Sequence, residues 1–239
     1  MTITKMIRLN KYLAECGVAS RRKCDQLILQ GLVSVDDVII KELGLKIDES
    51  RNRVKFKDVA LKPPKQYKYF LLNKPRGYVT TASDEKNRKT VLDLIDTGSR
   101  IYPVGRLDIN TSGLLLLSND GDLTYKLTHP KHEISKIYEA KLDSSLRPPD
   151  KTKLESGIRL EEGLTSKCSI EFPKKADKRI VRMAIHQGWK RQIRRMFEKL
   201  GYDVLELKRI GIAFLTLEGV AVRASRELTH HEIEKLKAL

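Results

Sequence analysis

One acidic residue, Asp108, lies in a short polar loop, where a carboxylate can act as a nucleophile or a base. The loop covers residues 105–113 and leads into four consecutive leucines at 114–117. A short apolar run bounded by turn residues is typical of a buried strand. Enzymes place reactive side chains on loops that such strands hold rigid. The alternative from spacing alone is a solvated turn aspartate.

A second candidate group is the sequence Arg-Gln-Ile-Arg-Arg-Met at 191–196. Apolar residues at helical spacing predict a helix here, ended by Gly201. Arg194 would lie at the edge of the buried stripe, about 100° round the helix. A guanidinium at that edge can reach a cleft and bind a carboxylate through two hydrogen bonds. Arg191 and Arg195 would point further outward, where phosphate is the expected partner.

Two predicted strands add further candidates. Residues 136–142 alternate in polarity, which puts Tyr138 on the inner face of a strand. A lone tyrosine in that position is more often a core residue than a binding residue. Residues 207–211 follow the predicted helix and form the second of these strands.

The elements near the N-terminus form a small unit over residues 7 to about 60. A first helix ends at Gly17, and Ser20 caps a second helix over 21–30. Short strands are expected at 32–35, 38–40, 44–47 and 53–56. The first turn of the second helix carries Arg21, Arg22 and Lys23, which oppose the helix dipole. We therefore expect these cations to bind phosphate, with a merely solvated basic turn as the alternative.

The stretch around Pro63 and Pro64 is the best linker in the chain, because two prolines stiffen it and prevent a helix from continuing. The sequence predicts a small first domain at 1–60, a linker at 61–66 and a second domain at 67–239.

Composition points to a polyanionic partner. Lys and Arg number 47 against 31 Asp and Glu, a net charge of +16, and the pI is about 9.7. A positive field of this kind attracts nucleic acid. We expect a cytoplasmic protein, because no apolar run approaches about 18 residues and no signal-peptide core is present. The pair His129 and His132 fits a turn better than a metal site.

The chain resembles RNA pseudouridine synthases of the RsuA/RluB/RluF type. The resemblance rests on the Asp108 loop through Gly121, a Lys-Pro-Arg-Gly turn at 74–77, and a Lys-x-Tyr motif at 136–138. The sequences at 191–196 and 207–211 follow in the family's order. Residues 8–13, 17–22 and 31–35 resemble a small αL-type (S4-like) RNA-binding domain.

The resemblance implies an α+β fold: the S4-like domain, then a catalytic domain with a mixed, largely antiparallel sheet. It also implies that Asp108 is the nucleophile, that Tyr138 lies against the target base and that Arg194 binds the Asp108 carboxylate. The expected substrate pocket and RNA contacts are as follows. Arg106, Leu107 and Leu207 line the pocket, and Lys11, Arg21, Arg22, Lys23, Lys74, Lys190, Arg191 and Arg195 contact RNA.

The implied function is isomerisation of one uridine to pseudouridine in ribosomal RNA, with the base flipped out of its stack. Large-subunit (23S) rRNA is favoured, and 16S rRNA or tRNA are the alternative substrates. Asp108 either attacks the nucleotide covalently or takes part in proton transfer. No metal or other cofactor is expected, and the protein is expected to be a monomer. A non-catalytic rRNA-binding or ribosome-assembly factor is the rival function.

Overall fold

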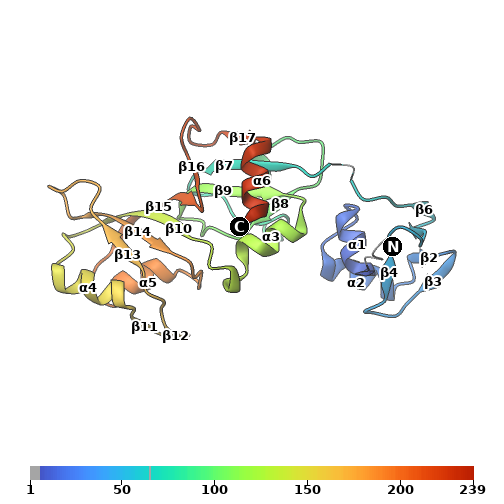
Figure 1. Ribbon diagram of the computed structural model, residues 1–239, viewed down its shortest axis with the longest axis horizontal. Coiled ribbons are helices and arrows are strands. Elements are labelled where there is room, and N and C mark those ends of the chain that lie inside the picture. Colours follow the sequence, from blue (N-terminus) through green and yellow to red (C-terminus); the bar gives the residue numbers. More distant parts are fainter. Residues whose placement is uncertain (1–5, 65) are drawn as a thin grey trace. The chain divides into compact units, whose positions relative to one another are not determined.

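The computed structural model describes residues 6–64 and 66–239, and the chain falls into two compact units, Met1–Tyr67 and Lys68–Leu239 (Figure 1). Within the described residues, no helix is long and apolar enough to cross a membrane. The elements of the first unit are β1 (Met6–Arg8), α1 (Leu9–Glu15), α2 (Arg21–Leu29), β2 (Val33–Val35), β3 (Val38–Ile40), β4 (Lys46–Asp48), β5 (Val54–Phe56) and β6 (Val59–Ala60).

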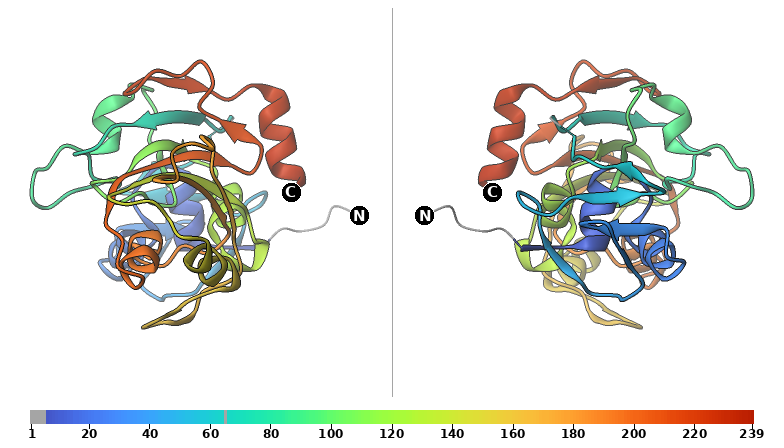
Figure 2. Two further views of the ribbon diagram at one scale, coloured as in Figure 1. Left: turned by 90° about the vertical axis from the view of Figure 1, so that its left-hand side faces the viewer. Right: turned by 90° about the vertical axis from the view of Figure 1, so that its right-hand side faces the viewer.

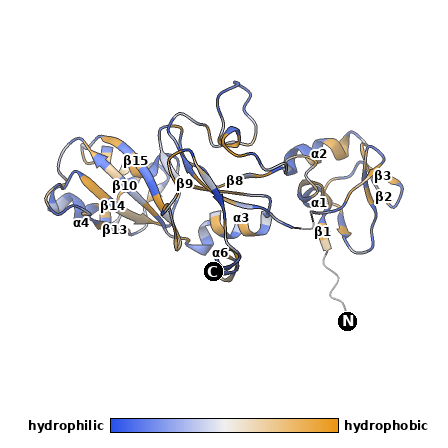
Figure 3. Ribbon diagram, turned by 90° about the horizontal axis from the view of Figure 1, so that it is seen from above, coloured by the Kyte–Doolittle hydropathy of each residue, from blue (hydrophilic) through white to orange (hydrophobic). Residues whose placement is uncertain are grey.

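The first unit packs two helices with short antiparallel strands. Leu9 and Leu13 of α1 meet Cys24 and Ile28 of α2 in a core of its own, and α2 carries both apolar and polar residues (Figure 3). The Ser20 hydroxyl accepts a hydrogen bond from the Lys23 N–H at 3.3 Å, which caps α2 as expected. The strands pair as β1–β4 and in the order β3-β2-β5-β6. Both predicted helices are confirmed, and the strand bounds differ from the predicted ones by a residue or two.

The second unit contains the remaining helices and a large sheet. Its elements are β7 (Tyr69–Lys74), η1 (Val91–Leu94), β8 (Tyr102–Val104), β9 (Ser112–Ser118), α3 (Gly121–Thr128), η2 (Pro130–His132), β10 (Lys136–Leu142), α4 (Pro148–Ser156), β11 (Arg159–Leu160), β12 (Gly163–Leu164), β13 (Ser169–Glu171), β14 (Ile180–Ile185), α5 (Gln192–Glu198), β15 (Val204–Ile212), β16 (Leu215–Thr216), β17 (Ser225–Glu227) and α6 (His230–Ala238).

The large sheet is mixed and largely antiparallel, which confirms the predicted fold class. Its main path runs β13-β14-β10-β15-β9-β7-β17, with β16 beside β15 and β8 beside β9. Among the strand pairs in the described residues, β9 and β15 are parallel and the others in this sheet are antiparallel. The parallel pair is short, with Ser112 opposite Lys208 and Gly113 opposite Arg209. The sheet therefore consists of two antiparallel halves joined at one short parallel contact.

Each half of the sheet has its own core. The four leucines of β9 are all buried, as the apolar run predicts. Leu114 and Leu116 pack with α3 and α6 on one face, while Leu115 and Leu117 pack toward η1 on the other. Figure 2 shows α6 and η1 on opposite sides of β7. In the other half, α4 and α5 pack on β10, β13, β14 and β15.

Gly113 allows the two halves to meet. Its φ is +105°, and a Cβ at this position would lie 2.1 Å from the backbone oxygen of Arg209. No side chain fits at that distance, so glycine is required by both conformation and space. The close approach of β9 to β15 thus depends on this residue.

The sequence Asn119-Asp120-Gly121 predicts a tight turn after the four leucines. This prediction is wrong, because Asp120 is the N-cap of helix α3. Its carboxylate accepts hydrogen bonds from the N–H groups of Asp122 and Leu123 at 3.1 and 2.9 Å. Asp in front of an amphipathic run fits a helix start as well as a turn, and the apolar pair Leu123 and Leu127 decides for the helix.

Candidate active site

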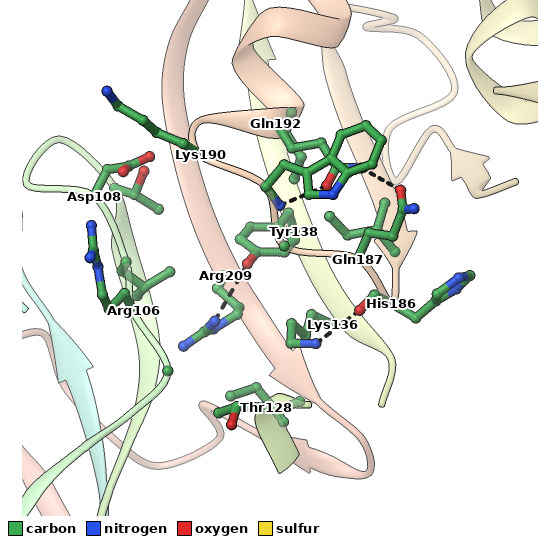
Figure 4. Close-up of a pocket in the computed structure, with 18 of the residues that line it drawn as sticks. Arg106, Asp108, Thr128, Lys136, Tyr138, His186, Gln187, Lys190, Gln192 and Arg209 are labelled. Carbon is green, nitrogen blue, oxygen red and sulfur yellow. Dashed lines mark hydrogen bonds between the residues drawn. The ribbon is translucent and has the colours of Figure 1, made fainter. Parts of the chain in front are cut away.

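A pocket of about 540 Å³ lies where the two halves of the sheet meet (Figure 4). One wall comes from the loop between β8 and β9, which contains Asp108. A second wall comes from β10 and β15, and a third from the turn between β14 and α5. The end of α3 and Pro130 of η2 complete the lining.

The loop that carries Asp108 is held from behind by a buried lysine. The Lys74 side chain is 0% exposed. Its ammonium group donates hydrogen bonds to the backbone oxygens of Pro75, Asp108 and Thr111 at 3.2, 3.2 and 2.8 Å. The Thr111 N–H also donates to the backbone oxygen of Asp108 at 2.9 Å. The backbone of Asp108 is therefore fixed, and the residue lines the pocket.

The prediction that Lys74 contacts RNA is wrong, because a fully buried ammonium group cannot reach a phosphate outside. The pKa of Lys74 is lowered to about 8, mainly by burial; the Asp108 charge opposes this shift and the nearby Arg209 contributes to it. Lys74 thus places a cation, with an unusually low affinity for its proton, beneath the Asp108 loop.

The residues before Asp108 are held in the same way. The buried Thr80 hydroxyl donates to the Leu107 oxygen at 2.7 Å and accepts from the Leu107 N–H at 3.3 Å. Leu107 is buried and Arg106 is exposed, and both line the pocket as expected. Thr80, three residues after the Lys-Pro-Arg-Gly turn, has no sequence signal of its own.

Tyr138 and Leu207 form part of the pocket from paired strands. Tyr138 is half-buried, and Leu207 is 5% exposed. The Arg209 guanidinium, opposite Tyr138 in the sheet, donates to the Tyr138 hydroxyl at 3.4 Å and to the Leu114 oxygen at 2.7 Å. The family resemblance also allows Leu205 in place of Leu207, but Leu205 is 50% exposed and does not line the pocket.

Arg194 does not form the expected pair with the Asp108 carboxylate. Its guanidinium donates instead to the backbone oxygens of Val204 at 2.6 Å and of Asn110, two residues after Asp108, at 3.2 Å. Burial is the main cause that lowers the pKa of Arg194. Arg191 and Arg76 lower it further, and Asp108 opposes this shift. Arg194 therefore lies within electrostatic range of Asp108 and ties its loop to β15.

The prediction that Arg195 points to phosphate is also wrong. Its guanidinium binds both carboxylate oxygens of Glu162 at 2.8 and 2.7 Å. This bidentate pair joins α5 to the β11–β12 hairpin, which sequence periodicity cannot reveal because Glu162 is distant in the chain. Lys190 and Arg191 are exposed and line the pocket, so they stay available for RNA.

In the first unit, Arg21, Arg22 and Lys23 are exposed in the first turn of α2. Lys11 lies 3.5 Å from Glu15 in an ion pair on α1. The exposed cluster at α2 fits the expected phosphate contacts, whereas Lys11 already has an acidic neighbour.

Two pocket residues were missed by sequence reasoning, Lys136 and Arg209. Lys136 shares the inner face of its strand with Tyr138, and Arg209 lies two residues beyond Leu207. The alternation that placed Tyr138 inside also places Lys136 inside. The sequence signal for Lys136 is therefore the same polarity alternation that identifies Tyr138.

The low pKa of Lys74 gives a prediction for stability. Its pKa is about 8 in the folded protein, against an ordinary value of 10.5. Between these values the unfolded chain binds more protons, so this group makes stability rise with pH. The free energy of unfolding of the wild type, relative to Lys74→Met, should increase by up to about 3 kcal/mol from pH 8 to pH 10.5.

Urea unfolding across this pH range measures the difference, and Lys190→Met is the control for an exposed lysine. A wild-type advantage that is constant with pH would show that Lys74 keeps an ordinary pKa.

Comparisons with known proteins agree with this geometry. The family described as RNA pseudouridylate synthase matches residues 68–199, and the S4 domain family matches residues 7–51. "Ribosomal large subunit pseudouridine synthase B" of Bacillus subtilis is 46% identical, over 98% of this chain and 97% of that protein. "Dual-specificity RNA pseudouridine synthase RluF" of Escherichia coli is 33% identical, over 95% of this chain and 77% of that protein.

A solved structure gives the same result. A chain described as "Crystal structure of pseudouridylate synthase" superposes with a TM-score of 0.70 at 31% identity, covering 96% of this chain and 99% of that chain. The family match covers more than half of the chain, and the relatives align along nearly all of it. The chain is therefore a member of the RNA pseudouridine synthase family, with an S4 domain before the synthase domain.

Proposed function

We propose that this protein converts one uridine of large-subunit (23S) ribosomal RNA to pseudouridine, as a cytoplasmic monomer, with Asp108 as the reacting carboxylate. The observation that carries the proposal is the position of Asp108: it lines the pocket on a loop whose backbone is fixed from behind. The choice of 23S rRNA is supported by the printed name of the Bacillus subtilis relative and its 46% identity.

The reaction needs an extruded nucleotide, because the glycosidic bond of a stacked base is inaccessible. We assign the sides of the uracil ring to Tyr138 and Leu207, which line the pocket on adjacent strands. An aromatic face beside a base contributes about 1–3 kcal/mol. Asp108 would then act near C1′ of the ribose, either by covalent attack or by proton transfer. Arg106 and Leu107 complete this part of the pocket.

Arg194 is proposed as a positioning residue. It holds the Asp108 loop through the Asn110 oxygen and contributes positive charge near the carboxylate. A fixed loop reduces the movement that the carboxylate must make before reaction. Such preorganisation supports Asp108 without a direct ion pair in the RNA-free protein.

The RNA contacts fall in both units. At the pocket, Lys190 and Arg191 are exposed cations next to the turn before α5. In the S4 domain, Arg21, Arg22 and Lys23 stand at the start of α2, where cations and helix N–H groups together favour phosphate. We propose these five residues, together with Lys11, as phosphate contacts.

Asp108→Asn should abolish isomerisation and leave folding and RNA affinity almost unchanged. The substitution keeps the side-chain shape but removes the charge and the nucleophile, so the rate should fall by several orders of magnitude. Tritium release from 23S rRNA labelled at uridine C5 measures turnover. Thermal unfolding and filter binding are the controls. Turnover near the wild-type rate would refute the role of Asp108, and an inactive wild type would favour a non-catalytic rRNA-binding factor.

Arg194→Ala should lower the single-turnover rate at saturating enzyme by about 100-fold, because a loop displaced by about 1 Å loses that much. Arg191→Ala, three residues earlier and exposed, should weaken binding and recover at low salt. Both variants are measured at two ionic strengths. Rescue of Arg194→Ala by low salt would show that it is another phosphate contact.

Replacing Arg21, Arg22 and Lys23 together with Gln should reduce the dependence of rRNA affinity on salt. Each lost phosphate contact should lower the slope of log affinity against log salt by about 0.7–0.9. Arg51→Gln is the matched control, since Arg51 is exposed but bound to Asp48. An unchanged slope for the triple variant would remove α2 from the RNA interface.

A further inference from the structure

The pocket holds far more positive than negative charge. Five lining residues are cations and one, Asp108, is a carboxylate, and the cations are of two kinds. Three are exposed, namely Arg106, Lys190 and Arg191, whereas Lys136 is half-buried and Arg209 is 3% exposed. The exposed group suits phosphates at the pocket mouth. The two inner cations need a different explanation.

The hydrogen bonds of Arg209 leave part of its guanidinium unused. Its Nε–H donates to the Leu114 oxygen and Nη1 to the Tyr138 hydroxyl. Nη2 is buried and, within the described residues, has no hydrogen-bond partner. An unpaired buried donor is costly, so this nitrogen is suited to an acceptor that a ligand brings into the pocket.

Lys136 lies near Arg209 and also has unused capacity. Its ammonium group donates to the backbone oxygens of Ile134 and His186 at 3.0 and 3.2 Å. An ammonium group has three N–H donors, so one has no acceptor in the part of the chain that the structure describes. Burial, with a smaller contribution from the Arg209 charge, lowers the pKa of Lys136 to about 8. Figure 4 shows both side chains toward the hydroxyl end of the Tyr138 ring.

On each of the two strands, the cation lies on the same face as the residue assigned to the uracil ring. Lys136 and Tyr138 are two apart on β10, and Leu207 and Arg209 are two apart on β15. A base between Tyr138 and Leu207 would therefore have cations along one edge. Uracil presents its O2 and O4 oxygens at its edges. A phosphate remains on the RNA chain and is better placed near the exposed cations at the mouth.

We propose that Lys136 and Arg209 bind the oxygens of the uracil ring and stabilise it as it leaves the ribose with negative charge. The inference deepens the proposed function and rests on it. The C1′–N1 bond breaks and its electron pair remains on uracil, spread over N1, O2 and O4. C5 then bonds to C1′, the C5 proton is lost, and N1 gains a proton. This charge develops in both routes open to Asp108.

Cations at this edge bind the uracil oxygens more strongly as negative charge develops during C1′–N1 cleavage. Interactions that are stronger in the transition state than in the ground state accelerate a reaction. Removing one hydrogen-bond donor that stabilises a developing anion in other enzymes reduces the rate by about 100- to 1,000-fold, and we expect a similar loss when Lys136 or Arg209 is replaced. The effect should be smaller when the leaving ring stabilises negative charge by itself.

The test compares two substrates with the full-length protein. Transcripts of 23S rRNA made with uridine or with 5-fluorouridine are treated with excess enzyme, and loss of the original nucleoside at the target site is followed by digestion and mass spectrometry. Fluorine withdraws electrons and makes the ring a better leaving group. Lys136→Met should convert the uridine transcript about 100-fold more slowly than the wild type does. The loss of rate should be clearly smaller with the 5-fluorouridine transcript.

Lys190→Met is the matched control at the pocket mouth: its loss should be equal for both substrates and recover at low salt. Lys136→Arg, which keeps the charge, should recover part of the uridine rate, and thermal unfolding checks the fold of each variant. Equal losses of Lys136→Met on both substrates, or rescue by low salt as for a phosphate contact, would overturn the inference. A wild type that converts neither transcript would refute the proposed function and this inference with it.

Discussion

The site depends on one buried charge that has no counter-ion within hydrogen-bond distance in the described residues. Lys74 is held by three backbone oxygens, two of them from the loop that carries Asp108. Carbonyl dipoles replace the water that the ammonium group loses on burial, and the loop must close round it to supply them. The buried ammonium group is therefore solvated only when the loop has this shape. These hydrogen bonds fix the backbone of the polar loop around Asp108.

The positive charge of the chain serves two purposes. Lys74, Arg195 and Arg209 are engaged by backbone oxygens or a carboxylate inside the second unit. Lys190, Arg191 and the start of α2 remain exposed. The net charge of +16 thus describes two populations, one that is engaged within the fold and one that is exposed. Composition alone cannot separate them, because burial depends on partners distant in the sequence.

Local patterns predicted much of the structure. Ser20 and Gly17 marked the helix ends in the first unit, the leucine run gave β9, and alternation placed Tyr138 inside. The errors at Lys74 and Arg195 share a physical cause, a partner far along the chain. Lys74 is buried by a loop more than thirty residues away, and Arg195 binds Glu162, thirty-three residues earlier. Periodicity fixes the direction of a side chain along its own element but does not identify what it meets.

Tyr138 packs against the cores of both halves of the sheet. The halves also join through the short β9–β15 pair with its glycine, and through hydrogen bonds from Arg194 to the Asn110 oxygen and from Arg209 to the Leu114 oxygen. Proteins open in cooperative segments with different free energies, and a seam between two cores is a natural boundary between such segments. Opening along this seam would separate Asp108 from Tyr138. The arrangement of Asp108 and Tyr138 that we propose for catalysis is thus a property of the seam, and how long it persists depends on the seam's own stability.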